Sequence, residues 1–132
     1  MNQYVVDASA LALALIDRGD EAMRLRRRLP RMHLHAPHLI DAELGNVLRH
    51  QEIAGAISPV EADAGRLAGA AVIRHRYGHD GLLGAEAWAL RHNVTFYDAL
   101  YVALAAALDV PLLTADRRLS NAPGLPCSVE VV

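Results

Sequence analysis

Short apolar runs alternate along the chain with longer segments whose apolar residues recur every three or four positions. The first run, residues 4–6, ends at Asp7 and is typical of a strand buried in a parallel sheet. Comparable runs predict further strands over residues 32–36, 71–77, 111–114 and 128–132, the last of them at an edge of the sheet. The pattern thus predicts five short strands separated by longer segments.

The longer segments have the spacing and the end signals of helices. Ser9 is suited to cap the first helix, and Pro30 ends the second. Ser58 and Glu61 together form the signature of a capped helix start. The expected helices cover residues 10–17, 21–29, 38–54, 58–69, 82–92 and 95–108. Because helices alternate with short buried strands, the sequence predicts an α/β fold, a three-layer α/β/α sandwich with a mainly parallel central sheet.

The composition is typical of one folded domain, which we expect to span residues 1–132. Hydrophobic residues make up 53% and charged residues 21% of the chain, which excludes intrinsic disorder as its main state. The single cysteine, Cys127, excludes a disulfide framework and a cysteine-based zinc site. No apolar run is long enough to span a bilayer, and no basic segment of the signal-peptide kind precedes the first one. We therefore expect a cytoplasmic protein that makes no use of a membrane.

The charged residues narrow the chemistry further. The formal net charge is −2, so the chain is not a nucleic-acid binder that relies on an overall positive charge. All 13 basic residues are arginines, and lysine is absent. The lack of lysine excludes P-loop NTPases and Schiff-base enzymes, because both need a lysine amine.

Four acidic residues stand where an open parallel sheet forms its sites. Asp7 and Asp116 follow two of the predicted strands, and Glu43 and Asp98 lie near the starts of two predicted helices. Carboxylates gathered in one crevice repel one another unless cations neutralise them. Oxygen ligands of this kind suit Mg²⁺ or Mn²⁺, held as one ion or as two about 3.5–4 Å apart, the arrangement used for in-line phosphoryl displacement.

Each of these acids also has a purely structural interpretation. Asp98 lies three residues after Thr95 and fits a capping box. Asp7 and Asp116 could satisfy backbone amides at a turn from strand to helix. Glu43 is harder to explain in this way, because a lone carboxylate among apolar neighbours on a helix is costly. The four acids together therefore favour a metal site more than any one of them does alone.

Four segments of the chain resemble, in order, the acidic motifs of PIN-domain proteins. They are VVDASAL at residues 5–11, APHLIDAE with NVL at residues 36–43 and 46–48, YDALYVALA at residues 97–105, and LLTADRRL at residues 112–119. The third segment resembles its counterpart most closely. The resemblance covers essentially the whole chain, with residues 69–84 explained least. The length is similar to that of the VapC toxins, the PIN ribonucleases of type II toxin–antitoxin pairs.

The resemblance implies a role for each motif residue. Asp7, Glu43, Asp98 and Asp116 would form an acidic quartet, in which Asp7 and Asp98 are the direct Mg²⁺ ligands. Ser9 and Thr114 would orient carboxylates or metal-bound water. Water activated by the metal would attack the scissile phosphorus of RNA and leave a 5′-phosphate and a 3′-hydroxyl. The family also implies a VapB-like antitoxin as a partner.

Other features of the sequence are less specific. The basic run on the second helix is a solvated face, a phosphate contact or an antitoxin-facing surface, and consists of Arg24, Arg26, Arg27, Arg28 and Arg31. Arg117 and Arg118 follow Asp116 and are better placed to contact substrate phosphate.

Histidines, aromatic residues and apolar helices give further, weaker signals. His33, His35 and His38 have spacing that only loosely resembles a metal site. Tyr97, Tyr101 and Trp88 are expected in the core or at an interface rather than stacked on bases. The Ala- and Leu-rich first helices suggest a homodimer and an antitoxin groove.

The leading hypothesis is therefore a metal-dependent endoribonuclease that acts as a toxin. One alternative is a PIN-fold nuclease of RNA processing that has no antitoxin. Another, from a different class, is a non-catalytic interaction module whose acids only cap helices.

Overall fold

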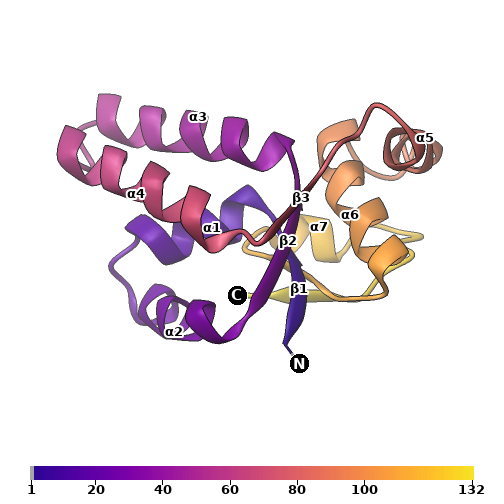
Figure 1. The fold of residues 1–132 in the computed structure, drawn as a ribbon, viewed down its shortest axis with the longest axis horizontal. Coiled ribbons are helices and arrows are strands. Elements are labelled where there is room, and N and C mark those ends of the chain that lie inside the picture. Colours follow the sequence, from indigo (N-terminus) through magenta and orange to yellow (C-terminus); the bar gives the residue numbers. More distant parts are fainter. Residues whose placement is uncertain (1) are drawn as a thin grey trace.

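The computed structural model describes residues 2–132, and its centre is a parallel β-sheet (Figure 1). The strands in this part of the chain are β1 (Gln3–Val6), β2 (His33–Pro37), β3 (His75–Tyr77), β4 (Leu112–Thr114) and β5 (Val129–Val131). They lie in the order β3-β2-β1-β4-β5, and every neighbouring pair is parallel. The expected α/β class is confirmed, and the sheet is wholly rather than mainly parallel.

Helices cover both faces of the sheet. They are α1 (Ala8–Ile16), α2 (Asp20–Arg28), α3 (Leu39–Ile53), α4 (Pro59–Val72), α5 (Leu82–Ala89), α6 (Phe96–Leu108) and α7 (Arg117–Ser120), with a 3-10 turn, η1 (Leu29–Arg31), after α2. Figure 1 shows α1 to α4 on one side of the strands and α5 to α7 on the other. The molecule therefore has the three layers that the sequence predicts. None of the helices within residues 2–132 is long and apolar enough to cross a membrane.

Two predicted element boundaries are wrong. The residue that caps α1 is Asp7 rather than Ser9, because the Asp7 carboxylate accepts the Ala10 N–H and the helix starts two residues earlier than predicted. The predicted strand over residues 71–77 begins only at His75. Residues 71 and 72 continue α4, whose helical hydrogen bonds satisfy their backbone groups, and β3 pairs with β2 alone.

Two further differences concern short segments. Helix α5 ends at Ala89 instead of residue 92, because Leu90 and Arg91 donate their N–H groups to Ala87 and Trp88 in tight turns. The four-residue helix α7 was not predicted, since one turn is too short to show a helical period.

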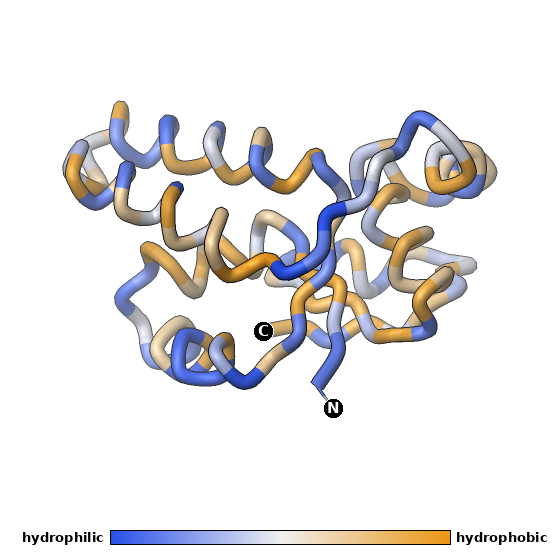
Figure 2. Tube along the Cα trace, in the orientation of Figure 1, coloured by the Kyte–Doolittle hydropathy of each residue, from blue (hydrophilic) through white to orange (hydrophobic). Residues whose placement is uncertain are grey.

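The core is formed by the strands and by the helix sides that face them. Val5, Leu34 and Leu112 are completely buried, and Leu11 of α1 and Tyr101 of α6 are 1% exposed. In Figure 2 the apolar stretches of the trace gather around the strands. The apolar residues of α1 are thus used by the chain's own core, so their abundance does not by itself indicate a subunit contact.

The topology opens a crevice between β1 and β4. The connections after β1 and β2 run on one face of the sheet, and those after β3 and β4 run on the other. Loops at the carboxyl ends of β1 and β4 therefore diverge, which is where open parallel sheets form their binding sites. Asp7 follows β1 and Asp116 lies two residues after β4, so both reach this crevice.

Candidate active site

Asp7 is the most buried acid of the crevice, with 7% of its surface exposed. Its Oδ1 accepts hydrogen bonds from the Ser9 hydroxyl at 2.6 Å and from the Ala10 N–H at 3.0 Å. Its Oδ2 accepts a hydrogen bond from the Thr114 hydroxyl. Three donors from α1 and β4 thus fix the orientation of this carboxylate.

The two hydroxyls that contact Asp7 also hold the loop after β4. The Ala115 N–H donates to Ser9 Oγ and the Asp116 N–H donates to Thr114 Oγ1, each at 3.0 Å. Ser9 and Thr114 therefore connect Asp7 to the segment that carries Asp116. Both residues thus contact a carboxylate of the predicted quartet.

Glu43 reaches the crevice from α3 and is half-buried. Its Oε1 accepts a hydrogen bond of 2.6 Å from the hydroxyl of Tyr101 on α6. The sequence correctly predicts Tyr101 in the core, but it misses this contact. The available signal was spacing, because Tyr101 follows Asp98 by three residues and shares its helix face.

Asp98 and Asp116 both lie at helix starts, as their structural interpretation requires. The Asp98 N–H donates to Thr95 Oγ1 at 3.2 Å, so Thr95 caps α6. Asp116 caps α7 by accepting the Arg118 N–H at 2.9 Å, and Arg118 Nε lies 3.4 Å from the same oxygen. Both carboxylates also line the crevice, so capping is not their only contact.

All four acids line a single pocket of about 280 Å³. They come from four separate parts of the chain, at the ends of β1 and β4 and on α3 and α6. Ser9, Asn46 and Tyr101 complete the polar part of the lining. Asn46 belongs to the second motif but was not predicted as a site residue, although it lies three residues after Glu43 and therefore on the same side of α3.

The electrostatics of the pocket disfavour its charged state. Burial raises the pKa of Asp7, Glu43 and Asp98 above the ordinary values of these carboxyl groups. Hydrogen bonds from hydroxyl groups partly oppose this rise. The negative charge of Asp98 raises the pKa of both Asp7 and Glu43, and Asp116 in turn raises that of Asp98. A cation in the pocket would relieve this repulsion.

Comparisons with known proteins agree with the motifs and the fold. The PIN domain family matches residues 4–125. Ribonuclease VapC1 of Mycobacterium tuberculosis is 52% identical over 132 residues, which cover 100% of this chain and 99% of the relative. The chain belongs to the PIN-domain family of VapC ribonucleases. The family membership that the four motifs predict is thereby confirmed.

Two solved structures share the fold of this chain. The crystal structure of PAE2754 from Pyrobaculum aerophilum has a TM-score of 0.69 at 27% identity, covering 91% of this chain and 84% of that one. The crystal structure of VapBC2 from Rickettsia felis, bound to a DNA fragment from their promoter, has a TM-score of 0.71. It is 12% identical and covers 98% of both chains, so it supports the fold alone.

The donor set of this VapC pocket suits a hard divalent cation. All four acids offer oxygen ligands. Within residues 2–132, Asp7 accepts hydrogen bonds on both carboxylate oxygens, and Glu43 and Asp116 each accept on one. No three His, Cys, Asp or Glu side chains in the described residues are already close enough together to hold an ion. The residues therefore fit a metal by chemistry, and their carboxylates must draw closer to share one.

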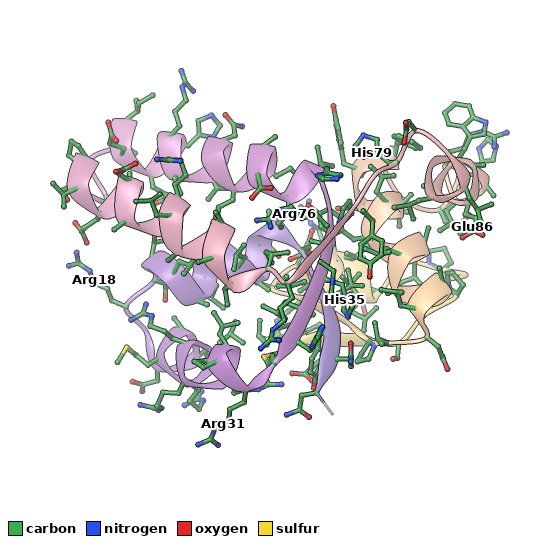
Figure 3. All side chains as sticks on the ribbon, viewed as in Figure 1. Arg18, Arg31, His35, Arg76, His79 and Glu86 are labelled. Carbon is green, nitrogen blue, oxygen red and sulfur yellow. The ribbon has the colours of Figure 1, made fainter. Side chains whose placement is uncertain are left out.

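Some arginines of this VapC chain make contacts within the fold, whereas others are exposed to solvent. Arg118 lies at the edge of the crevice, with its side chain 94% exposed, whereas Arg117 lines neither the acidic pocket nor its neighbour. In the basic run on α2, Arg26 donates to the Ala14 and Asp17 carbonyl oxygens, and Arg28 pairs with Glu130 at 2.8 Å. Arg31, at the end of η1, points away from the body of the molecule (Figure 3).

Two of the histidines stack with a third, and Tyr97 and Trp88 lie outside the core. His33 and His35 stack with His75 at ring-centroid distances of 5.0–5.1 Å, and His38 is not part of the stack. Both ring nitrogens of His35, which lies on β2 (Figure 3), already bond to Tyr77 and Gln3, so the stack is not a histidine metal site. Tyr97 and Trp88 are 61% and 58% exposed, since they lie on the outer sides of α6 and α5 rather than in the core.

Proposed function

We propose that this VapC-family chain is a metal-dependent endoribonuclease that acts as the toxin of a type II toxin–antitoxin pair. The observation that carries the proposal is the convergence of four carboxylates, from four separate elements, on one pocket at the carboxyl ends of β1 and β4. The identity of 52% to Ribonuclease VapC1 over the whole chain supports the same activity. Mg²⁺ is the preferred ion, and Mn²⁺ is an acceptable substitute.

The four acids divide the work in this proposal. Asp7 and Asp98 are the direct ligands of the ion, and Glu43 and Asp116 complete the acidic quartet. When bound, the ion supplies positive charge that activates water and stabilises the negative charge of the leaving oxygen. Ser9 and Thr114 keep Asp7 in a fixed orientation through their hydrogen bonds.

Tyr101 has a positioning role in the same scheme. Its hydroxyl holds Glu43 Oε1 and lowers the pKa of that carboxyl, against the opposing effect of burial. The hydrogen bond thereby favours the ionised form of Glu43, which is the form that interacts with a cation.

The reaction is a hydrolysis that forms no covalent bond to the protein. Oxygen from water bonds to the scissile phosphorus of RNA, and the bond from phosphorus to the 3′ oxygen breaks. The products are a 5′-phosphate end and a 3′-hydroxyl end. This outcome differs from attack by the RNA 2′-hydroxyl, which needs no metal and leaves a cyclic phosphate.

A VapB-like antitoxin is the proposed partner. A groove of about 490 Å³ adjoins the acidic pocket, since Ser9 and Val47 line both. Its apolar wall is formed by Ala12, Leu13, Ile16 and Ile57. An apolar antitoxin segment would bury these side chains, and a basic residue of its tail would compete with the cation for the carboxylates. A homodimer is also proposed for the toxin.

Cleavage of total RNA with mapping of the new ends tests the proposal. We expect 5′-phosphate ends that appear with Mg²⁺ and not in EDTA. The variant Asp98→Asn should lose cleavage, whereas Asp63→Asn, on the exposed side of α4, should retain it. Products with 2′,3′-cyclic phosphate, or cleavage that continues in EDTA, would contradict the proposed chemistry.

A further inference from the structure

A second pocket, of about 540 Å³, opens beside the acidic one. Asp98 and Asp116 line both pockets, so the two spaces are continuous across these carboxylates. Beyond them the lining changes character, because it includes Arg91, His92 and Arg118. The crevice therefore passes from an acidic centre to a basic flank.

Arg91 connects the basic flank to an exposed aromatic residue. Its guanidinium lies 4.8 Å from the centroid of the Trp88 ring, and its Nη1 donates to the Trp88 carbonyl oxygen at 3.0 Å. Trp88 is 58% exposed, and its ring meets the edge of Phe96 at 6.1 Å. A large indole surface held in place by its neighbours, yet open to solvent, is suited to stack on a planar partner.

The positive charges of the flank have little internal compensation. Arg91 forms no ion pair with any residue among 2–132, and Arg118 makes one long contact, of 3.4 Å, with Asp116. The Arg118 side chain is 94% exposed, which weakens that contact by solvent screening. Both guanidinium groups are thus available to an anionic ligand.

Exposed aromatic rings together with unpaired arginines are the features that bind single-stranded nucleic acid. We propose that the Trp88–Arg91 flank binds the single-stranded RNA segment next to the scissile phosphate. Arg118 and Arg91 contact backbone phosphates, and one base stacks against the exposed surface of Trp88. This subsite rests on the proposed ribonuclease function, because it positions the same RNA strand across the acidic pocket.

A second copy of the chain is the main alternative occupant of the Trp88 surface. Charge complementarity favours RNA, since a self-complementary interface would bring the Arg91 and Arg118 charges of two copies close together. The basic flank is also continuous with the acidic pocket, as binding of one RNA strand across both requires. A contact between two subunits does not require this continuity.

Trp88 is the only tryptophan, so its intrinsic fluorescence reports on this site alone. The probe is a mixed-sequence single-stranded RNA of about 12 nucleotides, titrated in EDTA so that it is bound without being cleaved. Anisotropy of a labelled copy measures the binding constant separately. We expect the Trp88 emission to be quenched with the same midpoint as the anisotropy change.

Substitutions of Trp88 and Arg91 test base stacking and the phosphate contact separately. Trp88→Ala should weaken RNA binding by about 5- to 100-fold, and Trp88→Phe should restore most of it. Arg91→Ala should reduce the slope of log affinity against log salt concentration by about 0.7, the value for one phosphate contact to a single strand. Arg66→Ala, on the exposed side of α4, is the matched control and should change neither quantity.

The outcomes separate this subsite from the proposed function. Failure of the wild type to bind the RNA probe, RNA binding without any change in Trp88 emission, or a Trp88→Ala variant that binds as well as the wild type would each overturn the subsite. If that variant instead becomes monomeric in sedimentation with RNA binding unchanged, the surface is a subunit contact and the subsite is also overturned. Cleavage by the wild type to 5′-phosphate ends would leave the ribonuclease function standing in all these cases.

Discussion

Asp7 shows how one residue combines a structural and a chemical position. It caps α1 through the Ala10 N–H, and it is also the most buried acid of the pocket. Capping and burial favour different states, because the helix N-terminus favours a charged carboxylate whereas burial raises its pKa. The hydroxyls of Ser9 and Thr114 keep this conflict tolerable by donating to both oxygens.

Asp98 is the acid whose charge acts on both Asp7 and Glu43, so it is the residue at which to test the proposed metal site. The variant Asp98→Asn keeps the backbone cap from Thr95 and removes one negative charge. We expect Mg²⁺ at 100 times its Kd to increase the free energy of unfolding of the wild type by about 2.7 kcal/mol and thereby to raise its melting temperature. The same Mg²⁺ concentration should have little effect on the variant. Thermal melts with and without Mg²⁺ measure this. An equal response in both proteins would remove Asp98 from the ligands.

Tyr101→Phe tests the hydrogen bond to Glu43. The ring still fills the core, but the donor that lowers the pKa of Glu43 is lost, so that pKa rises further. Activity that requires ionised Glu43 is lost as pH falls through this pKa, so the acidic limb of the rate profile should move to higher pH. The rate at neutral pH should fall by about 10- to 100-fold.

The matched control for Tyr101 is Tyr4→Phe. Tyr4 also donates its hydroxyl to a carboxylate, Glu130, but it lies outside the pocket. Rates of RNA cleavage measured across pH should show no displacement for this control. An acidic limb that stays in place in Tyr101→Phe would show that the hydrogen bond does not tune Glu43.

At the scale of elements, patterns predict best where local interactions decide the structure. The capping box of α4 forms as expected, with Ser58 and Glu61 each accepting the other's N–H. The strand expected over residues 71–77 was too long, because Ala-rich residues fit a helix as well as a buried strand and the packing of α4 on α3 decides between them.

Asp7 rather than Ser9 caps α1 because of contacts that the tertiary structure brings to both side chains. Asp7 directly precedes α1 and its Oδ1 can accept the Ala10 N–H together with the Ser9 hydroxyl, whereas the Ser9 hydroxyl contacts Asp7 and the Ala115 N–H.

Ser58→Ala measures the contribution of the α4 cap. Loss of the side-chain acceptor should reduce the free energy of unfolding by about 1 kcal/mol and the melting temperature by about 4 °C. RNA cleavage at lower temperature should be unchanged, because α4 contributes no residue to the acidic pocket. Chemical denaturation provides the measurement, with Ser128→Ala as a control on a residue outside any helix. A larger loss of activity than of stability would mean that α4 influences the site.

The whole molecule places an acidic centre, a basic flank and an apolar groove along one continuous crevice. The acidic pocket shares Asp98 and Asp116 with the basic flank, and it shares Ser9 and Val47 with the groove. We therefore expect an antitoxin chain that fills the groove to reach the carboxylates as well.

Expression in cells tests the molecule as a unit. The wild type alone should arrest growth, and co-expression with the small protein encoded beside it should restore growth. Asp7→Ala should abolish the arrest while the purified variant still binds the partner, because affinity arises mainly from the apolar groove. Growth curves and a pull-down of the folded variant measure the two effects. Arrest that persists with folded Asp7→Ala would separate the toxicity from this chemistry.

The sequence by itself determined the α/β class, the layered architecture and the four motifs that identify the family. These depend on local patterns, namely apolar periodicity and acids at the ends of strands and the starts of helices. Only the tertiary structure decided that Tyr101 reaches Glu43, 58 positions away, and that Arg91 and Arg118 border the crevice, with Trp88 in contact with Arg91. Such contacts join separate elements, and their distances follow from how helices pack across the sheet, which no local pattern of residues encodes.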